Sequence, residues 1–254
     1  MDFNKIAFFS LCLLLNFHSE AAETQTEYHA FSITTNTSRV IYPLSTNNKG
    51  VSLSVTNPQE YPVLIQAKIS GEDKISPAPF VITPPLFRLD GGKRSGLRIF
   101  RVGGDFSNEH ESLHWLCLTG IPPKQDDVWN NIEKYKKTNG TTVDIKLSVK
   151  TCLKFLVRPE KLKQSVEAVA GKLTWHRDDK KLHVDNPTPY YIDLANIDLG
   201  GKKIDLYSGG GERYIQPFSK KEFPLPDKVK GASTVTWQII NDYGEESKPF
   251  KANI

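Results

Sequence analysis

The most enzyme-like motif of the chain is His-Glu-Ser-Leu-His at residues 110–114, which fits H-E-x-x-H. On a helix, two histidines four residues apart share one face and can bind zinc, with the glutamate as general base. The surrounding residues predict a strand instead, because Leu113, Trp115 and Cys117 alternate with other residues and Gly-Ile-Pro-Pro follows at 120–123. In a strand, the two histidines stand roughly 13 Å apart, too far to share one zinc ion. We therefore predict no metal site, no catalytic residues and no cofactor.

Two cations interrupt apolar patterns and could bind an anion. Lys154 lies within Cys-Leu-Lys-Phe-Leu-Val at 152–157, and Arg39 directly precedes Val-Ile-Tyr at 40–42. A cation in an apolar strand is unfavourable unless it is paired or faces a cleft, so both are candidate anion-binding residues. The alternative is that each side chain extends into solvent at a strand end. Spacing alone leaves both interpretations open.

The N-terminus has the features of an export signal. Residues 1–5 carry one lysine, residues 6–17 are mostly apolar, and Ser19 and Ala21 are small residues placed for signal peptidase. We therefore expect cleavage near Ala21 and export of the remaining chain. The apolar run is shorter than the roughly 20 residues that a membrane span needs, and no later stretch comes near that length. Membrane insertion is not expected.

The cysteines favour a disulfide. Cys12 leaves with the signal, so Cys117 and Cys152 remain as an even pair in an oxidising compartment. A bridge between them closes a loop of about 35 residues, which contributes roughly 3–4 kcal/mol to stability in the chain-entropy model. Two distant cysteines are too few for a metal site.

The charge of the chain argues against nucleic acid as a partner. The formal net charge is +4 for 254 residues, and removing Asp2, Lys5 and Glu20 with the signal raises it by one. The basic residues are spread along the chain without a long Lys/Arg block, so they form no nucleic-acid footprint.

Short strands separated by turn residues must position these groups, as in β-sandwiches. Alternating or apolar segments occur at 51–55, 63–69, 97–100, 113–118, 172–175, 182–184, 190–194 and 234–240. Cleavage near Ala21 would remove a signal peptide at 1–21. A boundary near Pro159 then divides the rest into two all-β domains at 22–158 and 160–254. The one helical pattern is at 126–137, and the polar arm from Glu23 to Ala30 has no strand pattern.

The segment from Thr142 to Pro159 is the most informative strand. Val143, Ile145, Leu147 and Val149 alternate with polar or charged residues, so one face of this strand is apolar. We expect it to be exposed along one edge and to lend that edge to other polypeptides.

Several longer motifs, in this order, resemble the periplasmic chaperones of the bacterial chaperone–usher pathway over nearly the whole chain after the signal. The motifs are SRVIYP at 38–43, YPVLIQ at 61–66, TPPLFRL at 83–89, ESL at 111–113, IPP at 121–123, KFLVRP at 154–159, NPTPYY at 186–191 and INDYG at 240–244. The resemblance implies two immunoglobulin-like β-sandwich domains in a boomerang arrangement, with the binding cleft between them.

The resemblance also implies roles and partners. The partners would be fimbrial or surface-antigen subunits and an outer-membrane usher, and the site of action would be the periplasm. Arg39 and Lys154 would bind the C-terminal carboxylate of a subunit. Four donor side chains would fill the groove left by a strand that the subunit lacks, and an ionic cluster would hold the two domains together. The donor residues are Val143, Ile145, Leu147 and Val149, and the interdomain ionic cluster is Glu111, Arg158 and Asp242.

Some details resemble the subgroup with a long loop between the sixth and seventh strands of the first domain. That loop would span residues 124–141 here, and Cys117 and Cys152 lie where the subgroup's disulfide would form. The clients of this subgroup are usually subunits of thin, non-pilus adhesive fibres or capsule-like antigens.

Two alternatives concern the whole protein and its free state. The chain could itself be a fibre subunit or a secreted adhesin, but such subunits supply a donor segment at their own N-terminus, and residues 23–30 lack strong alternation. An exposed edge strand also leaves open a self-capping dimer of the free protein.

Overall fold

A computed structural model describes residues 25–29, 33–46, 49–123, 142–146, 148–208, 211–226, 231 and 233–254. Residues 25–29 and 142–146 are described by their backbone alone. The expected signal at 1–21, the helical pattern at 126–137, the long loop at 124–141 and Leu147 lie outside the described residues.

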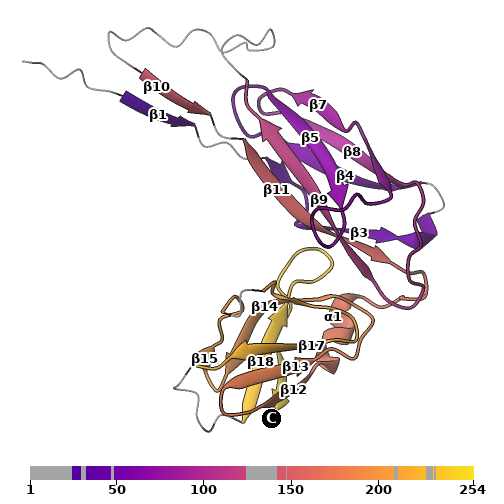
Figure 1. Cartoon of the computed structure of the whole chain (residues 1–254), viewed down its shortest axis with the longest axis vertical. Helices are drawn as coiled ribbons and strands as arrows, with labels where there is room; N and C mark the ends of the chain where they lie inside the picture. The colour runs from indigo at the N-terminus through magenta and orange to yellow at the C-terminus, as the bar shows by residue number, and fades with distance from the viewer. Residues whose placement is uncertain are drawn as a thin grey trace, which may run out of the picture.

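The N-terminal half of the described chain is a sandwich of two sheets (Figure 1). One sheet has the order β3 (Arg39–Pro43), β11 (Val149–Arg158), β9 (Ser112–Ile121), β5 (Val63–Ser70) and β7 (Leu86–Leu89). The other has the order β2 (Thr34–Thr35), β4 (Val51–Thr56), β8 (Arg94–Arg101) and β6 (Phe80–Thr83). A short 3-10 helix, η1 (Leu44–Thr46), follows β3. Strands β3 and β11 pair in parallel, whereas the other pairs of these two sheets are antiparallel.

Alternation along these strands builds the core of the sandwich. In β4, Leu53 and Val55 are buried while their neighbours are more exposed, and Leu97 and Ile99 of β8 are buried in the same way. Successive residues of a strand point to opposite faces, so one face of each sheet contacts the other sheet and the opposite face contacts solvent.

The C-terminal half forms a second sandwich. One sheet has the order β12 (Thr174–Arg177), β13 (Lys181–Asp185) and β17 (Lys220–Pro224). The other has the order β15 (Lys202–Lys203), β14 (Ile192–Leu199), β18 (Thr234–Ile239) and β19 (Phe250–Asn253). The short β16 (Tyr214–Ile215) also pairs with β14. The core includes Leu182, Ile197 and Trp237, which have almost no exposed surface.

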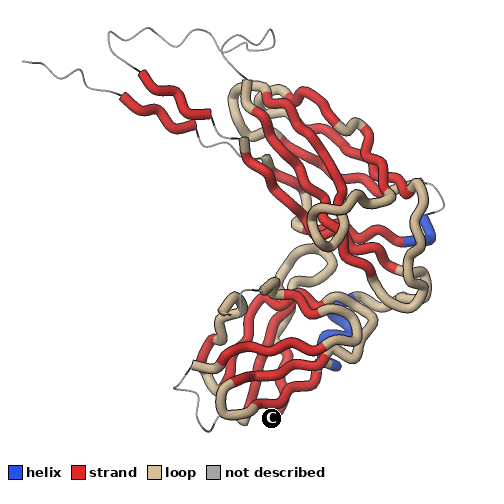
Figure 2. The backbone as a smooth tube through the Cα atoms, viewed as in Figure 1, coloured by secondary structure: helices blue, strands red, loops and turns tan. Residues whose placement is uncertain are grey.

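The two sandwiches meet at an angle (Figures 1 and 2). A separate buried cluster lies at their junction, where Leu113, Trp115 and Leu156 of the first sandwich pack with Tyr191 of the second. Gly244 adopts a φ of 89°, a left-handed conformation that favours glycine, where the second sandwich lies against Ser38 of the first. The prediction of an all-β protein with two immunoglobulin-like sandwiches is confirmed.

The expectation of one continuous strand from Thr142 to Pro159 is wrong. The structure has two strands, β10 (Thr142–Lys146) and β11, with Ser148 between them outside any strand. The expectation for the N-terminal arm is also wrong, because β1 (Gln25–His29) is a strand parallel to β10. Strand pairing uses backbone groups, so a polar segment can pair without the alternation that burial of one face produces.

A short helix lies in a segment where the sequence shows no helical pattern. Helix α1 (Val166–Val169) begins after Ser165, whose Oγ accepts a hydrogen bond from the backbone N–H of Ala168 at 3.3 Å. It continues into the 3-10 helix η2 (Ala170–Lys172), so the strand expected from Lys172 begins only at Thr174. Val166 and Val169 are buried in the core of the second sandwich, and this packing stabilises a helix of only four residues.

Candidate functional site: an anion-binding cluster between the two sandwiches

The pairing of β3 with β11 brings the two predicted cations together. Lys154 is the register partner of Arg39 in this parallel ladder. Register partners in a sheet lie side by side, so residues far apart in the sequence become neighbours. The structure therefore places Arg39 and Lys154 as one pair at the end of the first sandwich that faces the second.

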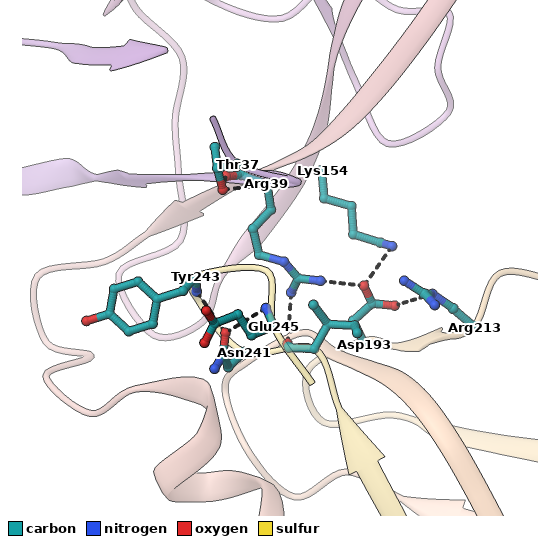
Figure 3. A network of polar contacts seen from close by, with 9 residues as sticks. Thr37, Arg39, Lys154, Asp193, Arg213, Asn241, Tyr243 and Glu245 are labelled. Carbon is teal, nitrogen blue, oxygen red and sulfur yellow. Dashed lines mark hydrogen bonds and ion pairs between the residues drawn. The ribbon is translucent and has the colours of Figure 1, made fainter. Parts of the chain in front are cut away.

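A carboxylate of the second sandwich lies between these cations (Figure 3). Asp193 of β14 accepts hydrogen bonds at Oδ2 from Arg39 Nη2 at 2.6 Å and from Lys154 Nζ at 3.0 Å. Arg213 Nε lies 3.1 Å from Asp193 Oδ1. Arg39 Nη1 also donates to the carbonyl of Ile240 at 3.0 Å. We call Arg39, Lys154, Asp193 and Arg213 the anion-binding cluster.

Burial differs strongly among the members of the cluster. The exposed fractions of the side chains are 3% for Arg39 and 2% for Asp193, but 14% for Lys154 and 32% for Arg213. Burial lowers the pKa of both Arg39 and Lys154 below their ordinary values, although the charge of Asp193 opposes this shift. Solvent therefore reaches the cluster from the side of Lys154 and Arg213.

Aromatic rings surround the ammonium group of Lys154. Its Nζ lies 5.6 Å from the ring centroids of both Trp115 and Tyr214. Cations are attracted to such ring faces within about 6 Å. The lysine is therefore held by one carboxylate and two rings, which fixes a normally flexible side chain in the cleft.

Glu72 joins the two halves beside this lysine. Its carboxylate accepts hydrogen bonds from the hydroxyls of Tyr191 and Tyr214, at 3.1 and 3.2 Å, and from Gln216 Nε2 at 2.8 Å. Its backbone carbonyl accepts one from Trp115 Nε1 at 3.1 Å. Burial and the charge of Glu72 raise the pKa of both tyrosines above the ordinary value, so both hydroxyls remain donors at neutral pH.

The three residues of the expected interdomain ionic cluster lie in contact. Arg158 Nε donates to Glu111 at 2.6 Å, and its two Nη atoms donate to Asp242 at 2.8 and 2.7 Å. The other oxygen of Glu111 accepts the backbone N–H of Tyr191 at 2.9 Å. Burial alone lowers the pKa of Arg158, but Asp242 and Glu111 outweigh it and raise that pKa. Arg158 and Glu111 come from the first sandwich, and Asp242 and Tyr191 from the second.

The predicted disulfide between Cys117 and Cys152 is present. The two cysteines are register partners on β9 and β11, with their Cα atoms 4.0 Å apart. The bridge therefore ties β11 to its antiparallel neighbour close to the start of β11.

The expected donor residues lie before β11 and at its first residue. Val143 and Ile145 are in β10, Val149 is the first residue of β11, and Leu147 lies outside the described residues. Strand β10 extends beyond the first sandwich, away from the second (Figure 1). The donor segment therefore begins before β11 and ends at its first residue, whereas Lys154 of the anion-binding cluster lies further along β11.

The H-E-x-x-H motif has the predicted strand setting over part of its length. His110 precedes β9, whereas His114 lies within β9 and contacts the rings of Phe80, Phe106 and Phe155. His110 Nδ1 instead donates to the backbone carbonyl of Glu111 at 2.8 Å. Within the described ranges, no group of three or more histidine, cysteine or acidic residues could hold a metal ion.

Burial of His114 predicts that stability depends on pH. In the described part of the chain neither ring nitrogen has a hydrogen-bond partner, and burial lowers its pKa below the ordinary 6.5. The unfolded chain therefore binds a proton more readily than the folded one, so stability is full above pH 6.5 and falls as pH drops below it. We expect denaturant unfolding to show a loss of up to about 1 kcal/mol per pH unit below that point.

His114→Phe is the matched variant, since phenylalanine suits the three surrounding rings. It should flatten this dependence, whereas His110→Gln, at an exposed histidine, should leave it unchanged. An unaltered slope in His114→Phe would refute the assignment.

Sequence reasoning missed Asp193, Arg213 and Glu72. Asp193 had a usable signal, because it interrupts an apolar run from Tyr190 to Leu194 as Lys154 interrupts its own run. Arg213 and Glu72 lie in polar loop segments, where charged residues are ordinary.

Two immunoglobulin-like sandwiches set at an angle, joined by a buried ionic junction, define the architecture of pilus-assembly chaperones. The chain belongs to this family. Residues 32–163 match the N-terminal domain of the pili and flagellar-assembly chaperone PapD, and residues 168–251 match the C-terminal domain of the pili assembly chaperone PapD.

Related proteins match this chain over nearly its full length. The chaperone protein MyfB of Yersinia enterocolitica is 52% identical, over 97% of this chain and 93% of its own. A chain of the Salmonella enterica SafA pilin complex with the SafB chaperone superposes with a TM-score of 0.77 at 39% identity, over 90% of this chain and 99% of its own. The Escherichia coli chaperone DraB gives a TM-score of 0.74 at 43% identity, over 91% and 100%. In the described residues, no helix is both long and apolar enough to span a bilayer.

Proposed function

We propose that this protein is a periplasmic assembly chaperone that binds surface-fibre subunits, completes their folds with its own β-strand and delivers them to an outer-membrane usher. The family is one of pilus-assembly chaperones, and a relative of known structure was solved in complex with the SafA pilin. The protein acts by binding and without catalysis. Residues 1–21 would direct export, and the mature domains would span 22–158 and 160–254.

The free edge of β10 carries this proposal. Strand β10 pairs on one side with β1, and among the described residues no strand pairs with its other side. An exposed strand edge offers unpaired N–H and C=O groups to another chain. Because β10 is followed by β11, which carries Lys154, one continuous segment leads from the open edge to the cleft.

The proposed capture has two parts. Val143, Ile145, Leu147 and Val149 insert into the subunit, while Arg39 and Lys154 bind its C-terminal carboxylate by charge-assisted hydrogen bonds. Burying four such aliphatic side chains contributes about 6–12 kcal/mol. Association costs on the order of 4–15 kcal/mol, so backbone pairing and the carboxylate contact are needed as well. The contacts of Glu111, Arg158 and Asp242 hold the two sandwiches against each other beside the cleft.

The test is co-purification of the tagged protein from periplasm, with identification and quantification of the bound subunit. Ile145→Asp with Leu147→Asp should reduce the recovered subunit by about 100-fold, because burial of an unpaired charge replaces burial of an apolar side chain. Circular dichroism should show that the variant itself remains folded.

A matched double variant changes the interleaved positions. Asp144→Asn with Lys146→Gln should leave subunit recovery within about twofold of wild type. These positions alternate with the donor residues, and each substitution replaces a charged side chain by a polar one. Equal recovery with both double variants would contradict the donor-strand proposal.

A further inference from the structure

Arg39 is closed to an external ligand in this structure. Its side chain is 3% exposed, and its two Nη atoms are engaged by Asp193 and by the carbonyl of Ile240. Its Nε is buried and has no hydrogen-bond partner in the described part of the chain. A carboxylate from another molecule therefore cannot contact this guanidinium until a group already there moves.

Asp193 is bound as a ligand carboxylate would be. A single oxygen, Oδ2, accepts from both Arg39 and Lys154, and the two donors come from the opposite sandwich (Figure 3). Its side chain is 2% exposed. A buried carboxylate shared by two cations of another domain is in the position expected for an anion held between them.

The cluster retains positive charge with Asp193 in place. Three cations, Arg39, Lys154 and Arg213, surround one carboxylate, so the formal charge is 3 − 1 = +2. Lys154 and Arg213 are the more exposed members, at 14% and 32%. An incoming anion therefore meets these two side chains first.

Arg213 is an alternative partner for the carboxylate of Asp193. Its Nε lies 3.1 Å from Oδ1, yet Oδ1 has no hydrogen bond of proper geometry in the described structure. Both groups belong to the second sandwich, on β14 and in the loop before β16. If Asp193 left the cations of the first sandwich, Arg213 could become its full partner and no carboxylate would be buried unpaired.

We infer that Asp193 is a resident carboxylate of the anion-binding cluster: it occupies Arg39 and Lys154 in the free protein and is replaced there by the C-terminal carboxylate of a client. The inference rests on the proposed function, in which those two cations bind the client. Replacement exchanges one carboxylate for another on the same donors, so no cation becomes unpaired. It also breaks contacts across the cleft, which couples client capture to the junction between the sandwiches.

The first test is chemical rescue with acetate. Asp193→Ala removes the carboxylate and should lower the midpoint of thermal unfolding, because three cations are left without it. Sodium acetate should restore a larger part of that loss than sodium chloride at equal ionic strength. Asp185→Ala removes a partly exposed carboxylate of the same sandwich, paired with Lys220, and should show no preference for acetate. Equal effects of acetate and chloride on Asp193→Ala would overturn the inference.

The second test measures binding of the synthetic peptide Ac-Thr-Val-Thr-Val-Thr-Val-Tyr, as the free acid and as the C-terminal amide. Asp193→Asn, which keeps the shape of the side chain, should bind the acid about tenfold more tightly than wild type and the amide no more tightly. A preference of wild type for the acid, without a gain in Asp193→Asn, would overturn the resident-carboxylate inference alone. If wild type and Lys154→Ala each bound the acid and the amide with equal affinity, the proposed carboxylate anchor itself would be overturned.

Discussion

Replacing Arg158 by methionine is expected to lower the free energy of unfolding by about 3–5 kcal/mol. The substitution leaves Glu111 in place with its side chain fully buried, and without the cation that donates to it at 2.6 Å. It also removes both hydrogen bonds to Asp242, which join the first sandwich to the second. Denaturant unfolding followed by tryptophan fluorescence measures the loss.

Two further variants separate a buried unpaired charge from a general effect of substitution. Glu111→Gln combined with Arg158→Met removes the buried charge, keeps an oxygen for the N–H of Tyr191, and should recover about half of the lost stability or more. Lys161→Ala, which removes an ion pair with Glu109 that is largely exposed, should change stability by less than about 1 kcal/mol. A loss below about 1 kcal/mol in Arg158→Met would contradict the importance of the ionic junction.

Removing the disulfide is expected to have an effect of similar size. Cys117→Ala with Cys152→Ala opens a loop with a sequence separation of 35 residues. The larger conformational freedom of the unfolded chain should reduce the free energy of unfolding by about 3–4 kcal/mol. The bridge joins two strands that already pair in the folded state, so the folded state should change little. Urea denaturation under oxidising conditions measures the difference.

Reductant supplies the matched control for this prediction. Wild type in excess dithiothreitol should unfold near the midpoint of the double alanine variant, while the variant itself should not respond to the reductant. If wild type had the same midpoint with and without reductant, the stabilising role of the bridge would be refuted.

Local patterns were sufficient to predict the longer strands of both sandwiches. Leu53 and Val55 of β4, or Ile65 and Ala67 of β5, are buried at every second position because each sheet presents one face to its own core. The cysteine pair needed only a count and an oxidising compartment. The same reasoning failed for β1, because a strand held by backbone pairing beside β10 needs no buried face.

The candidate site could be predicted only in part. Arg39 and Lys154 each stood out as a charge in an apolar run, which is a local signal of an unusual environment. Their assignment to one pair came from the family resemblance and not from their spacing. Helix α1 went unnoticed because four residues carry almost no helical period and depend on packing of Val166 and Val169.

The amino-acid sequence by itself determined that this protein is made of short strands, that it carries one cysteine pair, and that two cations lie in apolar surroundings. Each of these follows from residue types and their local spacing. Only the tertiary structure decided that β3 lies parallel to β11, which makes Arg39 and Lys154 neighbours, and that Asp193 of the other sandwich lies between them. The partner of a buried charge is set by long-range strand pairing and domain docking, and neither leaves a periodic trace in the chain.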